Sequence, residues 1–205
     1  MTDKKDKLAQ YKKKRDFRKT AEPAGETAEF SWADKRPIFV IQKHDASSLH
    51  YDFRLEVDGV LKSWAVPKGP ATDPKTKRLA VPTEDHPLEY ADFEGVIPEG
   101  EYGAGTVMVW DRGNYETLTK DDGGSEDDSI EKQLARGRVT IQLHGEKLAG
   151  GYALIRTGKG EDVRWLLIKM DDKNADARRN PVSSQPKSVK TGRTLNQIRK
   201  EAEKE

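Results

Sequence analysis

The sequence contains no cysteine among its 205 residues. This absence excludes structural disulfides, cysteine-ligated zinc, iron–sulfur clusters and thiol nucleophiles, so His, Asp or Glu must hold any bound metal. Apolar residues are also scarce, at 34% of the chain. No apolar run approaches the roughly 20 residues that a membrane-spanning helix needs, and residues 1–20 lack the apolar stretch of a secretory signal. The sequence therefore predicts a soluble cytoplasmic protein with no membrane contact.

Charge is abundant and unevenly distributed along the chain. Residues 1–20 carry 9 basic and 3 acidic side chains, residues 21–172 carry 19 and 29, and residues 173–205 carry 9 and 4. Basic ends suit a polyanion such as nucleic acid, although charged tails also simply keep proteins soluble. The sequence predicts three parts, which are a basic N-terminal arm over 1–29, a folded domain over 30–172 and a basic, flexible C-terminal tail over 173–205.

Short segments of alternating apolar and polar residues dominate the central part. Leu49–Val57 alternates strictly, Asp58 and Gly59 favour a tight turn, and Val60–Val66 follows, which predicts a β-hairpin. The other predicted strands are Pro37–Lys43, Arg78–Val81, Gly105–Asp111, Tyr115–Leu118, Gly137–Leu143, Tyr152–Thr157 and Val163–Met170. This pattern predicts a mainly β fold, a sandwich or an antiparallel β-barrel, of which we favour the barrel with a few short peripheral helices. The predicted helices are a short basic helix within 4–19, Ser129–Ala135 and Leu195–Glu203.

Polar side chains on the first strand of this hairpin form a candidate metal site. Because side chains alternate between faces, His50, Asp52 and Arg54 share the face opposite the apolar one. His44 lies just past the preceding strand, where a loop through Asp45–Ser48 folds it back towards that face. Two imidazoles and one carboxylate suit Mn²⁺, Fe²⁺ or Zn²⁺. The alternative is a solvated polar face with ordinary hydrogen bonds between histidine and aspartate.

Three further side chains extend this site towards phosphate chemistry. The guanidinium of Arg54, beside a metal, is a natural clamp for phosphate oxygens. His86 and Tyr90 are four residues apart, a spacing that shares a face in a strand or in a helical turn. A histidine that titrates near neutrality protonates a leaving oxygen or binds phosphate, and a tyrosine hydroxyl holds the same group. A purely structural contact between His86 and Tyr90 is the alternative.

Two other motifs carry little weight. Lys120–Gly123 fits the Lys-x-Asp-Gly pattern of nucleotidyltransferases, but it opens a wholly polar run with too little chain after it for such a domain. Pro98–Gly105 is rich in glycine, yet it lacks Gly-Lys-Ser/Thr and leads into a strand. It predicts a turn and not a phosphate-binding loop.

Two other functions fit some of the same residues. Iron(II)/2-oxoglutarate oxygenases use a His-x-Asp pair on a barrel strand, a distant histidine and a basic residue, which His50, Asp52, His144 and Arg156 match. That interpretation takes its third ligand from His144, whereas phosphoester chemistry takes it from His44. The third hypothesis is a non-enzymatic module that binds nucleic-acid ends, with the polar strand face as a passive anion site.

Four long segments carry a more specific signal, namely Phe39–Glu56, Ser63–Pro70, Glu84–Tyr90 and Phe93–Thr106. Together they resemble the 3′-phosphoesterase domain of bacterial DNA ligase D, and Tyr11–Pro23 resembles the N-terminal arm of that domain. The resemblance covers about residues 8–172 and leaves the C-terminal residues without a counterpart. It implies a β-barrel with a crescent-shaped active-site groove, in a free-standing protein without ligase or polymerase modules.

The resemblance implies a metal-dependent, preferably manganese-dependent, hydrolase that heals 3′ ends during end joining. Such enzymes remove a 3′-terminal ribonucleoside from a DNA or RNA–DNA primer-template to leave a 3′-phosphate. They then hydrolyse that phosphate to a 3′-hydroxyl. The implied partners are a separate DNA ligase, a primase-polymerase and an end-binding protein such as Ku, at the nucleoid of a prokaryotic cell.

The resemblance also implies roles for individual side chains. The metal ligands are His44, His50 and Asp52, for Mn²⁺ or another divalent transition metal. The phosphate-binding and catalytic residues are Arg54, His86 and Tyr90, and the supporting positions are Gln42, Lys68, Arg78 and Glu84. The residues of the N-terminal arm that are needed for activity, above all for nucleoside removal, are Arg15, Asp16 and Glu22.

Overall fold

The structure, a computed structural model, describes residues 7–25, 36–118, 128–158 and 160–204. The predicted boundary between arm and domain, at residues 29 and 30, and the motif Lys120–Gly123 lie outside these ranges. Within them, the helices are too short or too polar to cross a membrane.

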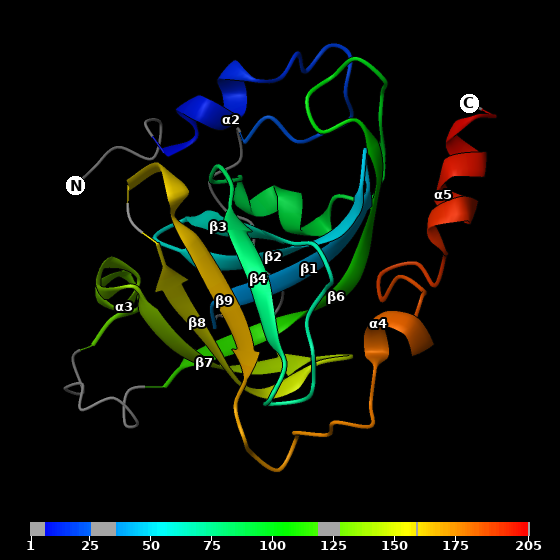
Figure 1. Cartoon of the computed structure of the whole chain (residues 1–205). Helices are drawn as coiled ribbons and strands as arrows, with labels where there is room; N and C mark the ends of the chain where they lie inside the picture. The colour runs from blue at the N-terminus through cyan, green and yellow to red at the C-terminus, as the bar shows by residue number, and fades with distance from the viewer. Residues whose placement is uncertain (1–6, 26–35, 119–127, 159, 205) are drawn as a thin grey trace.

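The fold is built from antiparallel strands, which are β1 (Ile38–Asp45), β2 (Leu49–Val57), β3 (Val60–Val66), β4 (Lys77–Pro82), β5 (Gly95–Ile97), β6 (Gly105–Thr117), β7 (Arg138–Gly145), β8 (Ala149–Thr157) and β9 (Arg164–Lys169). Eight of them close into a barrel in the order β1, β2, β3, β4, β9, β8, β7, β6, because β6 pairs back with β1 (Figure 1). The short β5 pairs with β6 outside this ring. The predicted antiparallel β-barrel is confirmed.

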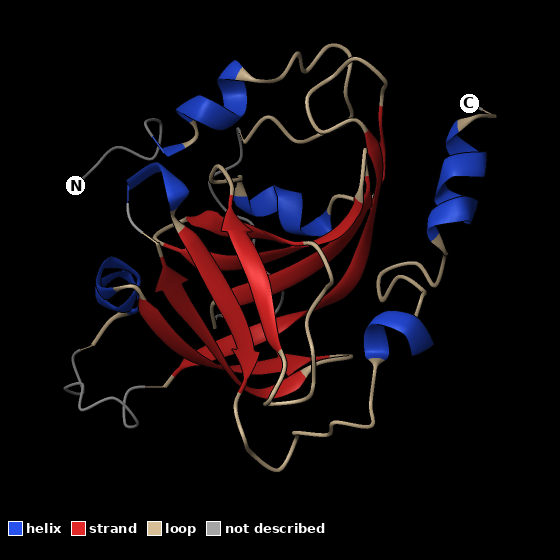
Figure 2. Ribbon diagram, viewed as in Figure 1, coloured by secondary structure: helices blue, strands red, loops and turns tan. Residues whose placement is uncertain are grey.

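Short helices lie outside the barrel (Figure 2). They are α2 (Ala9–Lys13), the 3₁₀ helix η1 (Leu88–Asp92), α3 (Ile130–Arg136), the 3₁₀ helix η2 (Gly160–Asp162), α4 (Pro181–Ser184) and α5 (Leu195–Ala202). A capping box begins α5, in which the side chains of Thr194 and Gln197 each accept a hydrogen bond from the other's backbone amide. The helices predicted at 129–135 and 195–203 are present, and a short basic helix lies within residues 4–19, as predicted.

Large apolar side chains fill the barrel interior. The alternation of β2 turns Phe53 and Leu55 inward, where they join Trp64, Trp110 and Trp165 from three other strands. The indole rings of Trp64 and Trp165 meet edge to face at 5.8 Å. The alternate positions of β2 consequently face outward, as period-two patterning predicts.

A second layer of chain covers the outward face of β1, β2, β3 and β6. Val40, Leu61 and Val109 point out of the barrel and pack with Tyr11 of α2 and Tyr90 of η1 in a separate apolar cluster. Figure 1 shows α2 and the loop that precedes β6 at the same end of the barrel. The polar side chains of β2 therefore lie between two layers of protein and not on an open surface.

One strand is longer than the sequence predicts. Gly105–Asp111 and Tyr115–Leu118 are predicted as separate strands, but β6 runs through both. Position 113 of β6 requires glycine, because a Cβ there would lie 2.0 Å from the carbonyl oxygen of His144 on β7. This glycine permits a close approach of two strands, and it does not mark a turn.

The C-terminal segment, residues 173–204, packs against the barrel, whereas the sequence predicts a flexible tail. Ile198 of α5 is 2% exposed and belongs to the barrel core. Ion pairs with the acidic domain add to this contact, namely Lys190 with Asp92, Arg193 with Glu94 and Arg199 with Asp45. The polar composition of the segment predicts disorder. This prediction is wrong because composition does not reveal ion-pair partners that are far away in the sequence.

We expect Ile198→Ala to lower the free energy of unfolding by about 2–4 kcal/mol, because it removes buried methyl groups and leaves a cavity. Urea denaturation followed by circular dichroism measures this change. Lys200→Ala, on the exposed side of the same helix, is the matched control and should change stability by no more than about 0.5 kcal/mol. Equal stability of both variants would show that α5 does not contribute to the fold.

Candidate active site and metal centre

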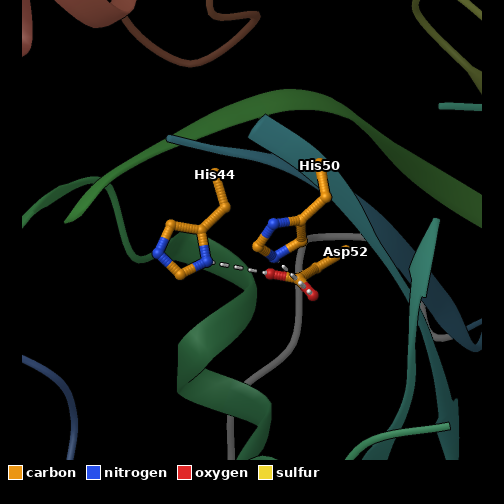
Figure 3. A group of neighbouring side chains, drawn as sticks. All are labelled: His44, His50 and Asp52. Carbon is orange, nitrogen blue, oxygen red and sulfur yellow. Dashed lines mark ion pairs between the residues drawn. The ribbon is translucent and has the colours of Figure 1, made fainter. Parts of the chain in front are cut away.

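The β1–β2 hairpin brings three candidate metal ligands together (Figure 3). His44 lies directly opposite His50 in the antiparallel register, and Asp52 follows two residues later on the same face. The carboxylate oxygens of Asp52 lie 3.5 Å from Nδ1 of His44 and 3.7 Å from Nε2 of His50. His44 reaches this position because it belongs to β1 itself and not to the loop that the sequence predicts.

The other ring nitrogen of each histidine is hydrogen-bonded to a backbone carbonyl. Nε2 of His44 lies 2.9 Å from the carbonyl oxygen of Gly103, and Nδ1 of His50 lies 2.8 Å from that of Ser48. Because a carbonyl oxygen only accepts, these two nitrogens donate, and the remaining nitrogen of each ring faces Asp52, where it would ligate a metal ion through its lone pair. Two imidazole lone pairs and a carboxylate, with one donor atom of each within 4.8 Å of the others, fit a divalent transition metal ion.

The carboxylate of Asp52 is buried and yet charged. Burial raises its pKa, but the guanidinium of Arg54 at 3.2 Å and the two imidazoles outweigh burial and hold the pKa of Asp52 below its usual value. Asp52 is therefore an anion at neutral pH, which is the form that binds a metal cation.

Arg54 is only 3% exposed and is fixed by several partners. Its Nε donates to Oε1 of Gln42 at 2.8 Å, its Nη1 donates to the hydroxyl of Ser63 at 2.8 Å, and its Nη2 faces Asp52. The amide nitrogen of Gln42 donates in turn to two backbone carbonyls at the η1 segment, each at 2.9 Å. Gln42 therefore ties the guanidinium to the layer that covers it.

His86 lies beside Arg54 but differs from prediction in its protonation. A backbone bridge to Leu61 of β3 positions it, and its Nδ1 lies 2.8 Å from the carbonyl oxygen of Glu84. Burial, followed by the guanidinium groups of Arg54 and Arg15, lowers the pKa of His86 well below its usual value. The imidazole is therefore neutral at neutral pH in the substrate-free site, whereas the sequence suggests a group that titrates there.

Tyr90 contacts His86, as their spacing predicts. The two rings meet edge to face with 4.7 Å between centroids. The hydroxyl of Tyr90 donates a 2.9 Å hydrogen bond to the carboxylate of Glu22. Burial and the charge of Glu22 raise the pKa of Tyr90 well above its usual value, so the hydroxyl keeps its proton.

The N-terminal arm supplies part of the site. Nε of Arg15 donates to Glu22 at 2.9 Å and Nη1 donates to Glu84 at 3.1 Å. The guanidinium also lies 3.9 Å from the ring centroid of Tyr11. The side chains of Arg15 and Glu84 are each 4% exposed, so this arm is docked into the domain through buried charge pairs.

A pocket of 270 Å³ is shared by the hairpin, the η1 layer and the arm. It is lined by Arg15, His44, Ala46, His50, Asp52, Arg54, Ala65, Thr83, Glu84, His86, Tyr90, Ile97, Tyr102 and Gly103. Gln42 and Glu22 lie behind this lining and hold Arg54 and Arg15. Three predicted positions lie away from it: Asp16 pairs with Arg18 on the arm, Lys68 is exposed after β3, and Arg78 sits on β4 opposite Leu167.

Several lining residues were not singled out from the sequence, and two of them share one segment. Tyr102 and Gly103 lie in the glycine-rich segment Pro98–Gly105, which the sequence correctly indicates as a turn. The positive φ of Gly103, at 77°, brings this turn across the mouth of the pocket and places its carbonyl on His44. The sequence does hold a signal for Tyr102, which is an aromatic residue in a glycine-rich turn. Turns of this kind seldom bury an aromatic side chain, so its presence there indicates a role in binding.

The oxygenase hypothesis is not supported by the geometry. His144 lies on β7, where its Nε2 pairs with a carboxylate oxygen of Glu116 at 3.3 Å and its side chain is 39% exposed. The group of potential metal ligands in the described ranges contains His44 and not His144.

Many of the basic side chains of the arm form ion pairs within the protein. Arm cations pair with acidic side chains, namely Lys7 with Asp58, Lys14 and Arg15 with Glu84, Arg18 with Asp16 and Lys19 with Glu101. Lys12 and Lys13 are exposed on α2 and make no ion pair with another described residue. These two lysines are therefore the arm's clearest candidates for contact with a nucleic-acid backbone.

We expect the double variant Lys12→Ala/Lys13→Ala to reduce the slope of log affinity against log salt for duplex DNA by up to about 2, since each phosphate contact releases about one counterion. Fluorescence anisotropy at several salt concentrations measures the slope. Arg18→Ala, whose charge is already paired with Asp16, is the control and should change the slope less. An unchanged slope in the double variant would place the phosphate contacts elsewhere.

Comparison with known proteins decides the family. The family model for the DNA ligase D 3′-phosphoesterase domain matches residues 42–156, which are more than half of the chain and include the whole metal group. This chain belongs to the DNA ligase D 3′-phosphoesterase family. It is accordingly a phosphoester hydrolase, and the resemblance seen in the sequence is confirmed.

Relatives extend this similarity beyond the matched range. The chain is 50% identical over 193 residues to the multifunctional non-homologous end joining protein LigD of Pseudomonas aeruginosa, which covers 92% of this chain and 22% of the relative. It is 48% identical over 165 residues to the multifunctional non-homologous end joining DNA repair protein LigD of Mycobacterium tuberculosis, which covers 80% and 20%. The chain thus spans about a fifth of the length of these end-joining relatives.

Proposed function

We propose that this protein is a metal-dependent phosphoesterase that heals 3′ ends of DNA and RNA–DNA primer-templates for repair by end joining. It removes 3′-terminal ribonucleosides and 3′-phosphates and leaves 3′-hydroxyl ends. One observation carries the proposal: the His44–His50–Asp52 group shares a pocket with the guanidinium groups of Arg54 and Arg15. A phosphate dianion needs such a concentration of positive charge to bind and to react.

The proposed metal is Mn²⁺, held by His44, His50 and Asp52. When bound there, it supplies a Lewis acid that polarises a phosphoryl oxygen. Mixed imidazole and carboxylate donors suit Mn²⁺, and they also accept other divalent transition metals.

The two guanidinium groups act as the anion clamp of the proposed site. Arg54 is anchored to the barrel through Gln42 and Ser63, and Arg15 is anchored to the arm through Glu22. Because these anchors fix both groups before substrate arrives, little reorganisation is needed when negative charge develops. The supporting role proposed for Glu84 is to hold Arg15 at the pocket.

His86 is proposed to donate a hydrogen bond or a proton to the leaving oxygen. Its low pKa in the free site results from burial beside two cations. A bound phosphate dianion neutralises those cations and favours the imidazolium, so His86 gains its proton as substrate binds. Tyr90 keeps its proton and orients His86 through their ring contact. The roles of Asp16, Lys68 and Arg78 are predictions that rest on the resemblance alone.

The partners are proposed from the product that the reaction leaves. A 3′-hydroxyl is the group that a polymerase extends and a ligase seals, and the named relatives are multifunctional end-joining proteins. We therefore propose that a DNA ligase, a primase-polymerase and a Ku-type end-binding protein act on the same ends, which places the protein at the nucleoid.

A 5′-labelled primer-template with a 3′-phosphate tests this function directly. Incubation with Mn²⁺ followed by gel electrophoresis should convert the primer to the slower 3′-hydroxyl form, and EDTA should prevent the conversion. Release of inorganic phosphate in equal amount confirms hydrolysis. A primer that stays unchanged at every divalent metal tested would refute the proposal and favour a module that only binds ends.

A further inference from the structure

Tyr102 is an exposed aromatic side chain at the mouth of the pocket. It belongs to the loop between β5 and β6, lines the pocket and is 45% exposed. Tyr90, the other tyrosine in the lining, is 2% exposed and packs in the apolar layer below. Of the two tyrosines in the described lining, Tyr102 is therefore the one whose ring is more open to a ligand.

The ring of Tyr102 is held in place although it is exposed. Nζ of Lys14 donates a 3.1 Å hydrogen bond to its hydroxyl, and the hydroxyl lies 3.4 Å from the carboxylate of Glu84. The guanidinium carbon of Arg15 lies 5.3 Å from its ring centroid. Large exposed side chains usually lose rotamer freedom when they bind a ligand, and these contacts restrict Tyr102 beforehand.

The position of Tyr102 relative to the chemistry is set by its neighbour. The carbonyl of Gly103 accepts the hydrogen bond from His44, so the ring is attached one residue away from a group in contact with a metal ligand. A nucleotide whose 3′-phosphate lies between the metal group and Arg54 carries its base on the adjoining sugar. We therefore expect the base to lie at the mouth of the pocket, beside Tyr102.

We propose that Tyr102 is a stacking platform for the terminal base of the primer strand, an inference that rests on the proposed 3′-phosphoesterase activity. Stacking on a phenol ring accepts any of the bases, because each has a π face. The platform therefore supplies affinity and alignment without sequence preference. It also selects a nucleotide terminus over a small phosphate ester that has no base.

The test compares two primers that both end in a 3′-phosphate, one on a normal nucleotide and one on an abasic tetrahydrofuran residue. Wild type and Tyr102→Phe should show kcat/KM about tenfold higher for the primer with the base, and Tyr102→Leu should bring that ratio close to one. Phe keeps the ring and removes the hydroxyl, so it separates stacking from hydrogen bonding. Melting temperatures of the variants check that the fold is retained.

A wild-type ratio in Tyr102→Leu would overturn the platform, and so would a Phe variant that loses the ratio as fully as Leu does. A second readout does not depend on hydrolysis: a 3′-phosphorylated primer ending in 2-aminopurine, bound in EDTA, reports stacking as fluorescence quenching. Quenching by wild type and Phe but not by Leu supports the platform even if no primer is hydrolysed, a result that would refute only the proposed activity. Equal quenching by all three proteins overturns the platform.

Discussion

Asp52→Asn should abolish conversion of a 3′-phosphate primer and weaken Mn²⁺ binding by at least about 100-fold, because it replaces the only anionic ligand of the group with a neutral amide. The amide keeps the shape of the side chain, and its oxygen still faces Arg54, so the fold should survive. Isothermal titration calorimetry with Mn²⁺ measures the affinity without reference to turnover. The primer assay measures activity at saturating metal.

His144→Ala is the matched control for this prediction. It also removes an ionisable side chain from a barrel strand, but that side chain lies on β7 against Glu116. Affinity for Mn²⁺ and turnover should both remain close to wild type. An Asp52→Asn protein that binds Mn²⁺ normally would show that the metal, if required, is held elsewhere.

We expect a primer that ends in a single ribonucleotide with a free 3′-hydroxyl to be shortened by one nucleoside, and an all-DNA primer to be left intact. The reason lies in the charge of the group attacked. A 3′-phosphate is dianionic and would bind the proposed clamp of Arg54 and Arg15 directly, whereas an internal diester carries one charge and would have to be aligned by other contacts. A 2′-hydroxyl offers such a contact, and it is the group that distinguishes RNA from DNA.

Gel analysis of the two 5′-labelled primers in parallel measures this difference. The ribonucleotide primer should pass through a 3′-phosphate form that then disappears, while the DNA primer shows less than about one hundredth of that rate, a difference worth roughly 3 kcal/mol in barrier height. A DNA primer that already carries a 3′-phosphate is the positive control. Progressive shortening of the DNA primer with a 3′-hydroxyl would make the protein a general 3′-exonuclease.

The local parts of the fold and site follow from the sequence, and the reason is visible in β2. Strict alternation over Leu49–Val57 fixes which side chains face the core, so the shared face of His50, Asp52 and Arg54 was predictable. To predict that His44 pairs with His50, the length of β1 must also be known. The strand was predicted to end at Lys43, but β1 continues to Asp45 opposite Leu49, and the connecting loop is confined to residues 46–48.

The layered parts of the site were not predictable from local patterns. Arg15 and Glu84 are separated by 69 residues, and nothing near either of them in the sequence indicates that they form a buried pair. The low pKa of His86 depends partly on the same layer, because burial and Arg54 of β2 lower it and the arm adds Arg15. Likewise, Arg193 pairs with Glu94, which lies 99 residues away in the sequence.

The residue pairs of this structure are separated by very different numbers of residues, which favours an order of assembly. His44 and His50 meet across one short hairpin, whereas Arg15 reaches Glu84 over 69 residues and Arg199 reaches Asp45 over 154. Closing a longer loop costs more entropy and waits for more of the chain to fold. We therefore expect the metal ligands to come together before the anion clamp, which is complete only when the arm docks on the strands.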